Sequence, residues 1–176
     1  MALWEVFNST DTPETLAARP EMKYMPKTMV DQWAAAKQKM LASGDPKAGA
    51  RLLEVRKKIL RALHNAGARI VFGTDSPQIF SVPGFSIHRE APIMVASGMK
   101  PYDVLRSLTR NVAEYFGTLT DSGTVEASKR ADLVLLEADP LKDVAALSRR
   151  AGVMVRGRWL AESEIQSRLQ ALAQKN

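Results

Sequence analysis

The sequence predicts an α/β fold, and three features of its pattern lead to this prediction. An amphipathic helical stretch runs from Asp45 to Gly67 and carries its apolar residues on one face, at Ala48, Leu52, Val55, Ile59 and Leu63. A short apolar run, 69–73, follows it across a tight turn, which is typical of the αβ half of a parallel β/α unit. After Thr118 the pattern changes to short strand-like runs. We therefore divide the chain at 118–122, into residues 1–120 and 121–176.

The N-terminal elements follow from caps and helix breakers. Residues 8–27 contain three prolines and no sustained period, so we expect a loop. A helix is predicted over 28–42, with one apolar face made by Met29, Trp33, Ala36 and Met40. Asp45 caps the next helix and Pro46 takes its first position, where a missing amide costs nothing. Gly67 ends this helix at a position suited to a left-handed turn.

The remaining elements are shorter. The run 69–73 is predicted as a strand buried on both faces, and 76–86 as a loop. Helices are predicted over 87–97 and 101–117, the second burying Val104, Leu105, Leu108, Val112 and Phe116. Beyond them we expect strands at 123–126, 132–136 and 153–156, a tight turn at 156–158, and helices at 141–148 and 162–173.

Composition excludes several classes of protein. The chain has 176 residues, 45% of them hydrophobic and 25% charged, as in ordinary globular domains. No apolar run reaches the ~18–20 residues that cross a bilayer, so we expect no membrane partner. With no cysteine, a disulfide scaffold, a thiolate zinc site and a cysteine nucleophile are all excluded. This fits a cytoplasmic location and leaves a periplasmic one open, and Met1–Phe7 does not resemble a secretion signal.

Positive charge is concentrated in one region. The net charge is +6, and nine basic residues but only two acidic ones lie between Lys37 and Arg69. No aromatic residues for base stacking and no nucleic-acid-binding motif accompany this run. We interpret it as a solvated helix face and expect no nucleic-acid partner.

Asp75 is the first candidate for chemistry. It follows the apolar run 69–73, so a buried strand would deliver its carboxylate at the strand's carboxyl end. A carboxylate there can bind a cation or accept a proton from water. The alternative is that Asp75 and Ser76 simply begin a turn before Pro77. Ser76, Ser81 and Ser86 lie in the following loop, but no Gly-x-Ser-x-Gly elbow is present for a serine hydrolase.

A series of short motifs resembles the C-terminal part of a metal-dependent amidohydrolase, of the imidazolonepropionase-like or Xaa-Pro-dipeptidase-like branch. The resemblance is strongest from Gly67 to Leu160 and rests on the order of Gly73-Thr-Asp-Ser76, Pro83-Gly84, Ile87-His-Arg-Glu90, Ser97-Gly98, Thr109-Arg-Asn-Val-Ala113, Gly123-Thr-Val125, Lys129-Arg-Ala-Asp-Leu-Val-Leu135 and Arg156-Gly-Arg-Trp159.

This resemblance implies a fold and a site. Residues 1–120 would carry the last strand and flanking helices of a (β/α)8 TIM-type barrel, and 121–176 the returning strands of a small β-sandwich with a C-terminal helix. Asp75 would be both the catalytic proton shuttle and a metal ligand. The complete protein would hold one or two divalent ions, usually zinc, and act on an amide or cyclic amide of a small molecule or a dipeptide.

The chain also departs from the family. The His-x-His pair, the Lys or carboxylate and the two further histidines that hold the family's metal are not in this sequence, whose histidines are His64 and His88. A catalytic zinc needs about three protein ligands, which Asp75 alone cannot supply. We therefore expect the chain alone to be inactive and to bind no metal by itself. Its expected partners are a small amide substrate and either the N-terminal half of a barrel or another copy of the chain.

Three further residues are candidates for supporting roles. His88 opens the helix after the loop and matches a family histidine, either at the rim of the substrate site or, as we favour, orienting the loop. Tyr24 lies in a segment, 19–26, that resembles a family segment near the active site and is a candidate substrate contact. His64 is interpreted as a favourable charge at a helix C-terminus. The alternative function is a non-catalytic binding or assembly module derived from an amidohydrolase.

Overall fold

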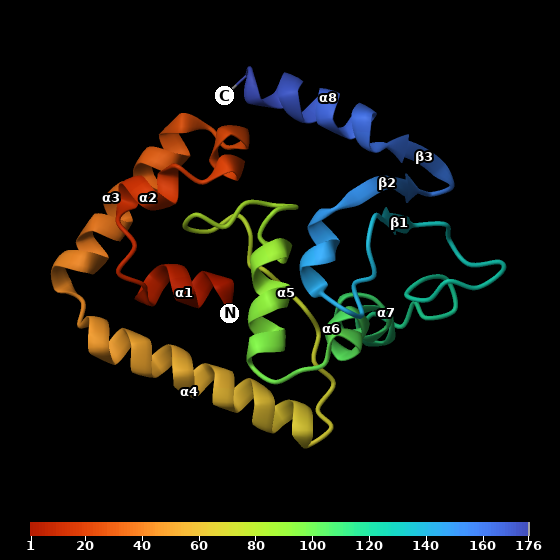
Figure 1. The fold of residues 1–176 in the computed structure, drawn as a ribbon, viewed down its shortest axis with the longest axis horizontal. Coiled ribbons are helices and arrows are strands. Elements are labelled where there is room, and N and C mark those ends of the chain that lie inside the picture. Colours follow the sequence, from red (N-terminus) through yellow and green to blue (C-terminus); the bar gives the residue numbers. More distant parts are fainter. Residues whose placement is uncertain (176) are drawn as a thin grey trace.

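The computed structural model describes residues 1–175 as an α/β structure with a small antiparallel sheet (Figure 1). The helices are α1 (Ala2–Asn8), α2 (Pro13–Ala17), η1 (Pro20–Tyr24), α3 (Lys27–Ser43), α4 (Pro46–Asn65), α5 (Ile87–Ala96), α6 (Pro101–Leu108), α7 (Arg110–Tyr115), η2 (Val144–Ser148) and α8 (Glu162–Ala173). The strands are β1 (Leu133–Leu136), β2 (Arg150–Val155) and β3 (Arg158–Ala161). No helix of the described part of the chain is both long and apolar enough to cross a membrane.

The N-terminal region contains more helix than the sequence predicted. Residues 8–27 were expected as a loop, but they include α2 and η1. Pro13 and Pro20 each take the first position of their helix, where proline is tolerated, and the Thr12 side chain accepts a hydrogen bond from the amide of Thr15. Together with α1 and α3 these helices enclose one core cluster, made by Leu3, Val6, Leu16, Met22, Ile79, Phe80 and Val82.

Helix α4 begins and ends where the sequence predicted. The Asp45 side chain accepts a hydrogen bond from the amide of Lys47 at 2.9 Å, and Gly67 has a φ of +76°. The apolar face that the sequence predicted is open to solvent, because Leu52, Val55, Ile59 and Leu63 are exposed. A different face of α4 packs on the rest of the molecule: Gly49 lies close to Asn8, and the Arg56 guanidinium lies over the Trp4 ring.

Residues 69–74 form an extended segment that ends at Asp75 and belongs to no sheet. The Phe72 amide donates to the carbonyl of Ser107 at 3.0 Å, and the Asn111 amide group donates to the carbonyl of Ile70 at 2.8 Å. The side chains of Ile70 and Phe72 pack against a second core cluster, whereas Val71 points away and is exposed. The predicted burial on both faces is therefore wrong, since no neighbouring strand lies beside this segment within residues 1–175.

The second core cluster lies around α5 and α6, at Ala91, Met94, Met99, Val104 and Val144. The single helix predicted over 101–117 is divided into α6 and α7, because Thr109 leaves helical geometry with φ −127° and ψ −87°. Phe116, expected in the core, is 68% exposed after this change of direction.

The sheet has the strand order β1-β2-β3, with both pairs antiparallel. The tight turn predicted between the last two strands is present, with positive φ at Arg156 and Gly157. A Cβ at Gly152 would collide with the ring of Trp159 on the neighbouring strand, so this position needs a glycine. The strand predicted at 123–126 is wrong, because these residues form a bend followed by irregular chain. Helix α8 leads from the sheet back to η1 (Figure 1).

Candidate functional site

Asp75 lies at the carboxyl end of the extended segment, as the sequence predicted. Its side chain is exposed, so the carboxylate is open to solvent instead of being held in a salt bridge beneath the core. The backbone of Asp75 is left-handed, with a φ of 54°, and only a few non-glycine residues adopt this conformation. Asp is one of the residues that adopt it more readily, and Phe80, Ser128 and Arg156 also have a positive φ.

A chain of hydroxyl groups fixes the loop on both sides of Asp75. The Ser81 hydroxyl lies 2.7 Å from that of Ser76 and donates to Ser86 at 3.0 Å. The Thr74 hydroxyl donates to Ser76 at 3.1 Å, which connects the extended segment to the network. Ser81 and Ser86 are buried, so these bonds are shielded from water. The sequence pointed to these serines only as possible nucleophiles, and they instead hold the residues that flank the carboxylate.

The described residues do not form a metal site by themselves. Within residues 1–175, no three His, Cys, Asp or Glu side chains gather closely enough to hold an ion. His64 lies in the last turn of α4, where its Nε2 is 3.5 Å from a carboxylate oxygen of Asp103 on α6. Within residues 1–175, neither His64 nor Asp103 therefore forms a ligand cluster with Asp75.

His88 lies in the first turn of α5 and lines a cavity of about 590 Å³ together with Arg19 and Arg89. Its Nδ1 is buried and has no hydrogen-bond partner among the described residues. Burial lowers the pKa of His88, and the charge of Arg150 lowers it further, while Glu21 opposes this shift. Neither Asp75 nor Tyr24 lines this cavity, so the three predicted site residues do not share one pocket.

Tyr24 contacts the loop that follows Asp75. Its ring stacks on Phe85 with the centroids 4.9 Å apart and the planes at 15°. A second contact links α5 to η1, because the Nη2 of Arg89 on α5 donates a hydrogen bond to the Glu21 carboxylate on η1 at 2.8 Å. These contacts join η1 and α5 to the Asp75 loop, and a direct contact of Tyr24 with substrate stays a prediction.

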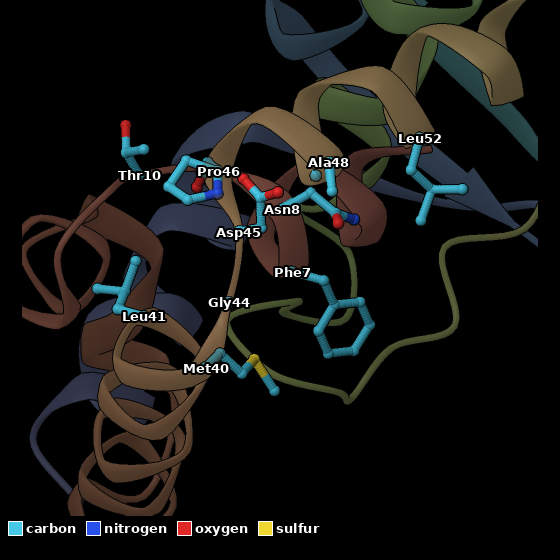
Figure 2. A pocket seen from close by; sticks show the side chains of 12 residues that line it. Phe7, Asn8, Thr10, Met40, Leu41, Gly44, Asp45, Pro46, Ala48 and Leu52 are labelled. Atoms are coloured by element: carbon cyan, nitrogen blue, oxygen red, sulfur yellow. The ribbon is translucent and has the colours of Figure 1, made fainter.

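A smaller pocket of about 260 Å³ lies where α1 meets the junction of α3 and α4 (Figure 2). Its wall is largely apolar and includes Phe7, Met40 and Leu52. The carboxylate of Asp45 lies in this wall but is already used as the cap of α4. No set of acid and base groups converges here, so Asp75 remains the better candidate for catalysis.

Comparison with known proteins identifies the family. The model of the amidohydrolase family matches residues 5–160. The chain belongs to the amidohydrolase family. The predicted resemblance is thereby confirmed, and the carboxylate at the end of the extended segment lies inside the matched region.

Individual amidohydrolase relatives support the same assignment. The chain is 31% identical to an imidazolonepropionase from Shouchella clausii (strain KSM-K16) over 113 residues, which are 60% of this chain and 24% of that protein. A solved bottromycin amidohydrolase is similar with a TM-score of 0.77 and 26% identity, over 96% of this chain and 38% of that one. A Xaa-Pro dipeptidase with bound methionine shares the fold, with a TM-score of 0.55 and 22% identity, over 85% of this chain and 32% of that one.

The chain is much shorter than these amidohydrolases. It spans 24% of the imidazolonepropionase and 38% of the bottromycin amidohydrolase. The matched region is thus about a quarter to two fifths of the length of these relatives.

Proposed function

We propose that this chain is part of an enzyme that hydrolyses a C–N bond, in an amide or cyclic amide of a small molecule or in a dipeptide. Membership of the amidohydrolase family supports hydrolysis as the reaction. The position of Asp75 supports this residue as the catalytic one. Asp75 is the exposed carboxylate at the end of the extended segment, next to a loop that a buried hydroxyl network holds in place.

The chemistry assigned to Asp75 is general acid–base catalysis. The carboxylate accepts a proton from a water molecule as the water oxygen bonds to the amide carbonyl carbon. It then returns this proton to the departing nitrogen as the C–N bond breaks, so the carboxylate is regenerated. A fixed loop on both sides keeps the carboxylate oriented, which lowers the entropic cost of each transfer.

The metal that the family resemblance implies does not fit the described residues alone. A catalytic zinc takes about three protein ligands, and within residues 1–175 no three His, Cys, Asp or Glu side chains gather closely enough to hold one. We propose that the one or two divalent ions of the complete enzyme, zinc by preference, are held mainly by residues outside this chain.

The purified chain tests this proposal. With and without added zinc, we expect no turnover of an N-acyl amino acid above the level of buffer. Substantial zinc-dependent turnover by the chain alone would show that its own residues complete the site and would overturn this assignment. In an assembly that supplies the remaining barrel, zinc-dependent hydrolysis should appear and should be lost with Asp75→Asn.

A second candidate function is a non-catalytic binding or assembly module. The exposed apolar face of α4 favours it, because such a face is typical of an interaction site. Light scattering distinguishes the two. A stable, zinc-free monomer favours an independent module, whereas association or instability favours an incomplete barrel.

A further inference from the structure

The cavity beside His88 is enclosed by segments that lie far apart in the sequence. It has a volume of about 590 Å³ and lies between α1, the start of α4 and α5, with residues 9–11 and Arg19 completing its wall. Helix α1 contacts both α4 and α5, and Figure 1 shows it next to each of them. Sites for small molecules have volumes of about 300–1,000 Å³, so the cavity is large enough for a small ligand.

Arg19 brings an unused hydrogen-bond donor into this wall. Its side chain is 17% exposed, and its Nη1 is buried and has no hydrogen-bond partner within residues 1–175. Its Nη2 is 3.8 Å from Oδ2 of Asp11, which is longer than a hydrogen bond. Burial lowers the pKa of Arg19 and the charge of Arg89 lowers it further, while nearby carboxylates oppose this shift. Since buried guanidinium donors are normally paired, the carboxylate of a ligand would complete this one.

A carboxylate lines the same cavity without being joined to this arginine. Glu5 on α1 belongs to the wall, and its charge raises the pKa of Arg19, so the two groups are close enough to interact. They form no salt bridge with each other in the described part of the chain, where Arg19 pairs with Asp11. The wall therefore offers separate positions for the carboxylate and for the ammonium group of a ligand.

The ring of His88 contributes a third unused polar atom. Its Nδ1 is buried and has no hydrogen-bond partner among the described residues. Burial lowers the pKa of His88, so the ring is neutral in neutral solution, and Nδ1 of a neutral ring either donates or accepts one hydrogen bond. It can therefore bond to either polar group of a ligand.

The charges of the wall favour a zwitterion over a simple anion. Two arginines and two acids line the cavity, namely Arg19, Arg89, Glu5 and Asp11. Arg89 is already bound to a third acid, Glu21, to which its Nε and Nη2 donate at 3.0 Å and 2.8 Å. A simple anion would be repelled by Glu5 and Asp11, whereas a zwitterion adds no net charge and can meet both signs.

We propose that this cavity binds a free α-amino acid with an apolar side chain. The carboxylate of the ligand accepts a hydrogen bond from Nη1 of Arg19, and its ammonium group lies against Glu5. The side chain of the ligand packs on the apolar part of the wall, which includes Leu53 and Ile93. Asp75 takes no part in this binding, so the inference goes beyond hydrolysis and does not rest on the proposed function.

Three ligands that differ in one group each test this site. L-leucine carries both charged groups, 3-methylbutylamine lacks the carboxylate, and 4-methylpentanoate lacks the ammonium group. In isothermal titration calorimetry with the purified chain, we expect L-leucine to bind at one site with a dissociation constant of about 1 mM or lower. Each of the other two ligands should bind about tenfold or more weakly, because one charged group of the wall is then left without its partner.

Two variants assign each end of the ligand to its residue. Arg19→Gln should weaken L-leucine about tenfold and leave the affinity for 3-methylbutylamine unchanged, because that amine has no carboxylate. Glu5→Gln should weaken L-leucine to a similar extent and leave 4-methylpentanoate unchanged or bound more tightly, because a repulsive charge is removed. A variant that had merely lost its fold would weaken all three ligands alike, so the pattern separates binding from folding.

Matched controls lie away from the cavity. Arg168→Gln changes an arginine on α8 that is 59% exposed, and Glu137→Gln changes an exposed glutamate after β1. Both should bind L-leucine like the wild type, and circular dichroism should show unchanged helix content in all four variants.

Four results would overturn the inference. They are no saturable binding of L-leucine, equal affinity for the three ligands, equal weakening by the cavity variants and their controls, and tighter binding of 4-methylpentanoate than of L-leucine. The last result would assign the cavity to a simple carboxylic acid. Because binding is measured without turnover, a complete enzyme that hydrolyses an amide while its cavity fails to bind L-leucine would overturn this inference and leave the proposed function standing.

Discussion

The ammonium group of Lys37 donates a hydrogen bond of 2.6 Å to the carbonyl oxygen of Val6. Lys37 belongs to α3 and is fully buried, and Val6 lies near the C-terminal end of α1. The same amine donates to the carbonyl of Ser9 at 2.6 Å. Carbonyls at the end of a helix lack partners within the helix, so one side chain satisfies two of them and fixes α1 against α3.

Replacing this lysine should therefore destabilise the chain strongly. Lys37→Ala leaves two carbonyls without the amine and opens a cavity, and we expect a loss of about 2–4 kcal/mol in the free energy of unfolding. Urea denaturation followed by tryptophan fluorescence measures it. Lys39→Ala, an exposed neighbour on α3, should change this free energy by less than about 0.5 kcal/mol. Equal effects of the two variants would contradict this role of Lys37.

Lys37 also makes stability depend on alkaline pH. Burial lowers its pKa from the ordinary 10.5, with Asp11 opposing the shift and Arg19 adding to it. Between the lowered pKa and 10.5 the unfolded chain binds more protons than the folded one, so stability rises with pH in this window. The wild type should gain stability relative to Lys37→Ala as the pH approaches 10.5. A constant difference between the two would contradict the shift.

The boundaries of α4 were predictable because they depend on local chemistry. Asp45 caps α4 and Gly67 takes a left-handed turn, and both features are visible in the sequence. The burial of Lys37 and the exposure of Leu52 were not predictable, because each depends on which segment lies opposite in space. Hydrophobic periodicity shows which face of a helix is apolar, but it does not show whether the covering segment is present.

The site was predictable in part for the same reason. A carboxylate directly after an apolar extended run is a local pattern, so Asp75 was found at the end of this segment. The bonds among Ser76, Ser81 and Ser86 depend on the path of the loop between them, for which the sequence shows no period.

Removing the central hydroxyl of this network should loosen the Asp75 loop. Ser81→Ala leaves the hydroxyls of Ser76 and Ser86 without their shared partner, and we expect a loss of about 1–2 kcal/mol in the free energy of unfolding. Amide hydrogen exchange should also become faster in the loop 76–86. Ser167→Ala, an exposed serine on α8, is the control and should be close to neutral. Unchanged exchange in the loop would show that the network does not hold it.

The left-handed backbone of Asp75 should cost stability. Glycine adopts this conformation without a Cβ penalty, so Asp75→Gly should raise the free energy of unfolding by about 0.5–1 kcal/mol. Asp75→Asn keeps a side chain that tolerates this conformation and should change stability little. Thermal unfolding of the three proteins measures both effects. A lower stability of Asp75→Gly would mean that contacts of the aspartate side chain outweigh the cost of its left-handed backbone.

His88 should make the chain less stable in mild acid. Burial and the charge of Arg150 lower its pKa below the ordinary 6.5, with Glu21 opposing this shift. As the pH falls from 6.5 toward the lowered pKa, the unfolded chain takes up more protons than the folded one, so the free energy of unfolding decreases. Below the lowered pKa both states are protonated and the decrease stops. His88→Gln should remove this dependence from the urea midpoint between pH 7.5 and pH 5, whereas His64→Gln should keep it. The opposite outcome is that the stability of the wild type and of His88→Gln depends on pH in the same way. It would show that the cavity beside Arg19 and Arg89 does not disfavour the charged ring, and that the buried Nδ1 gains a partner when it is protonated.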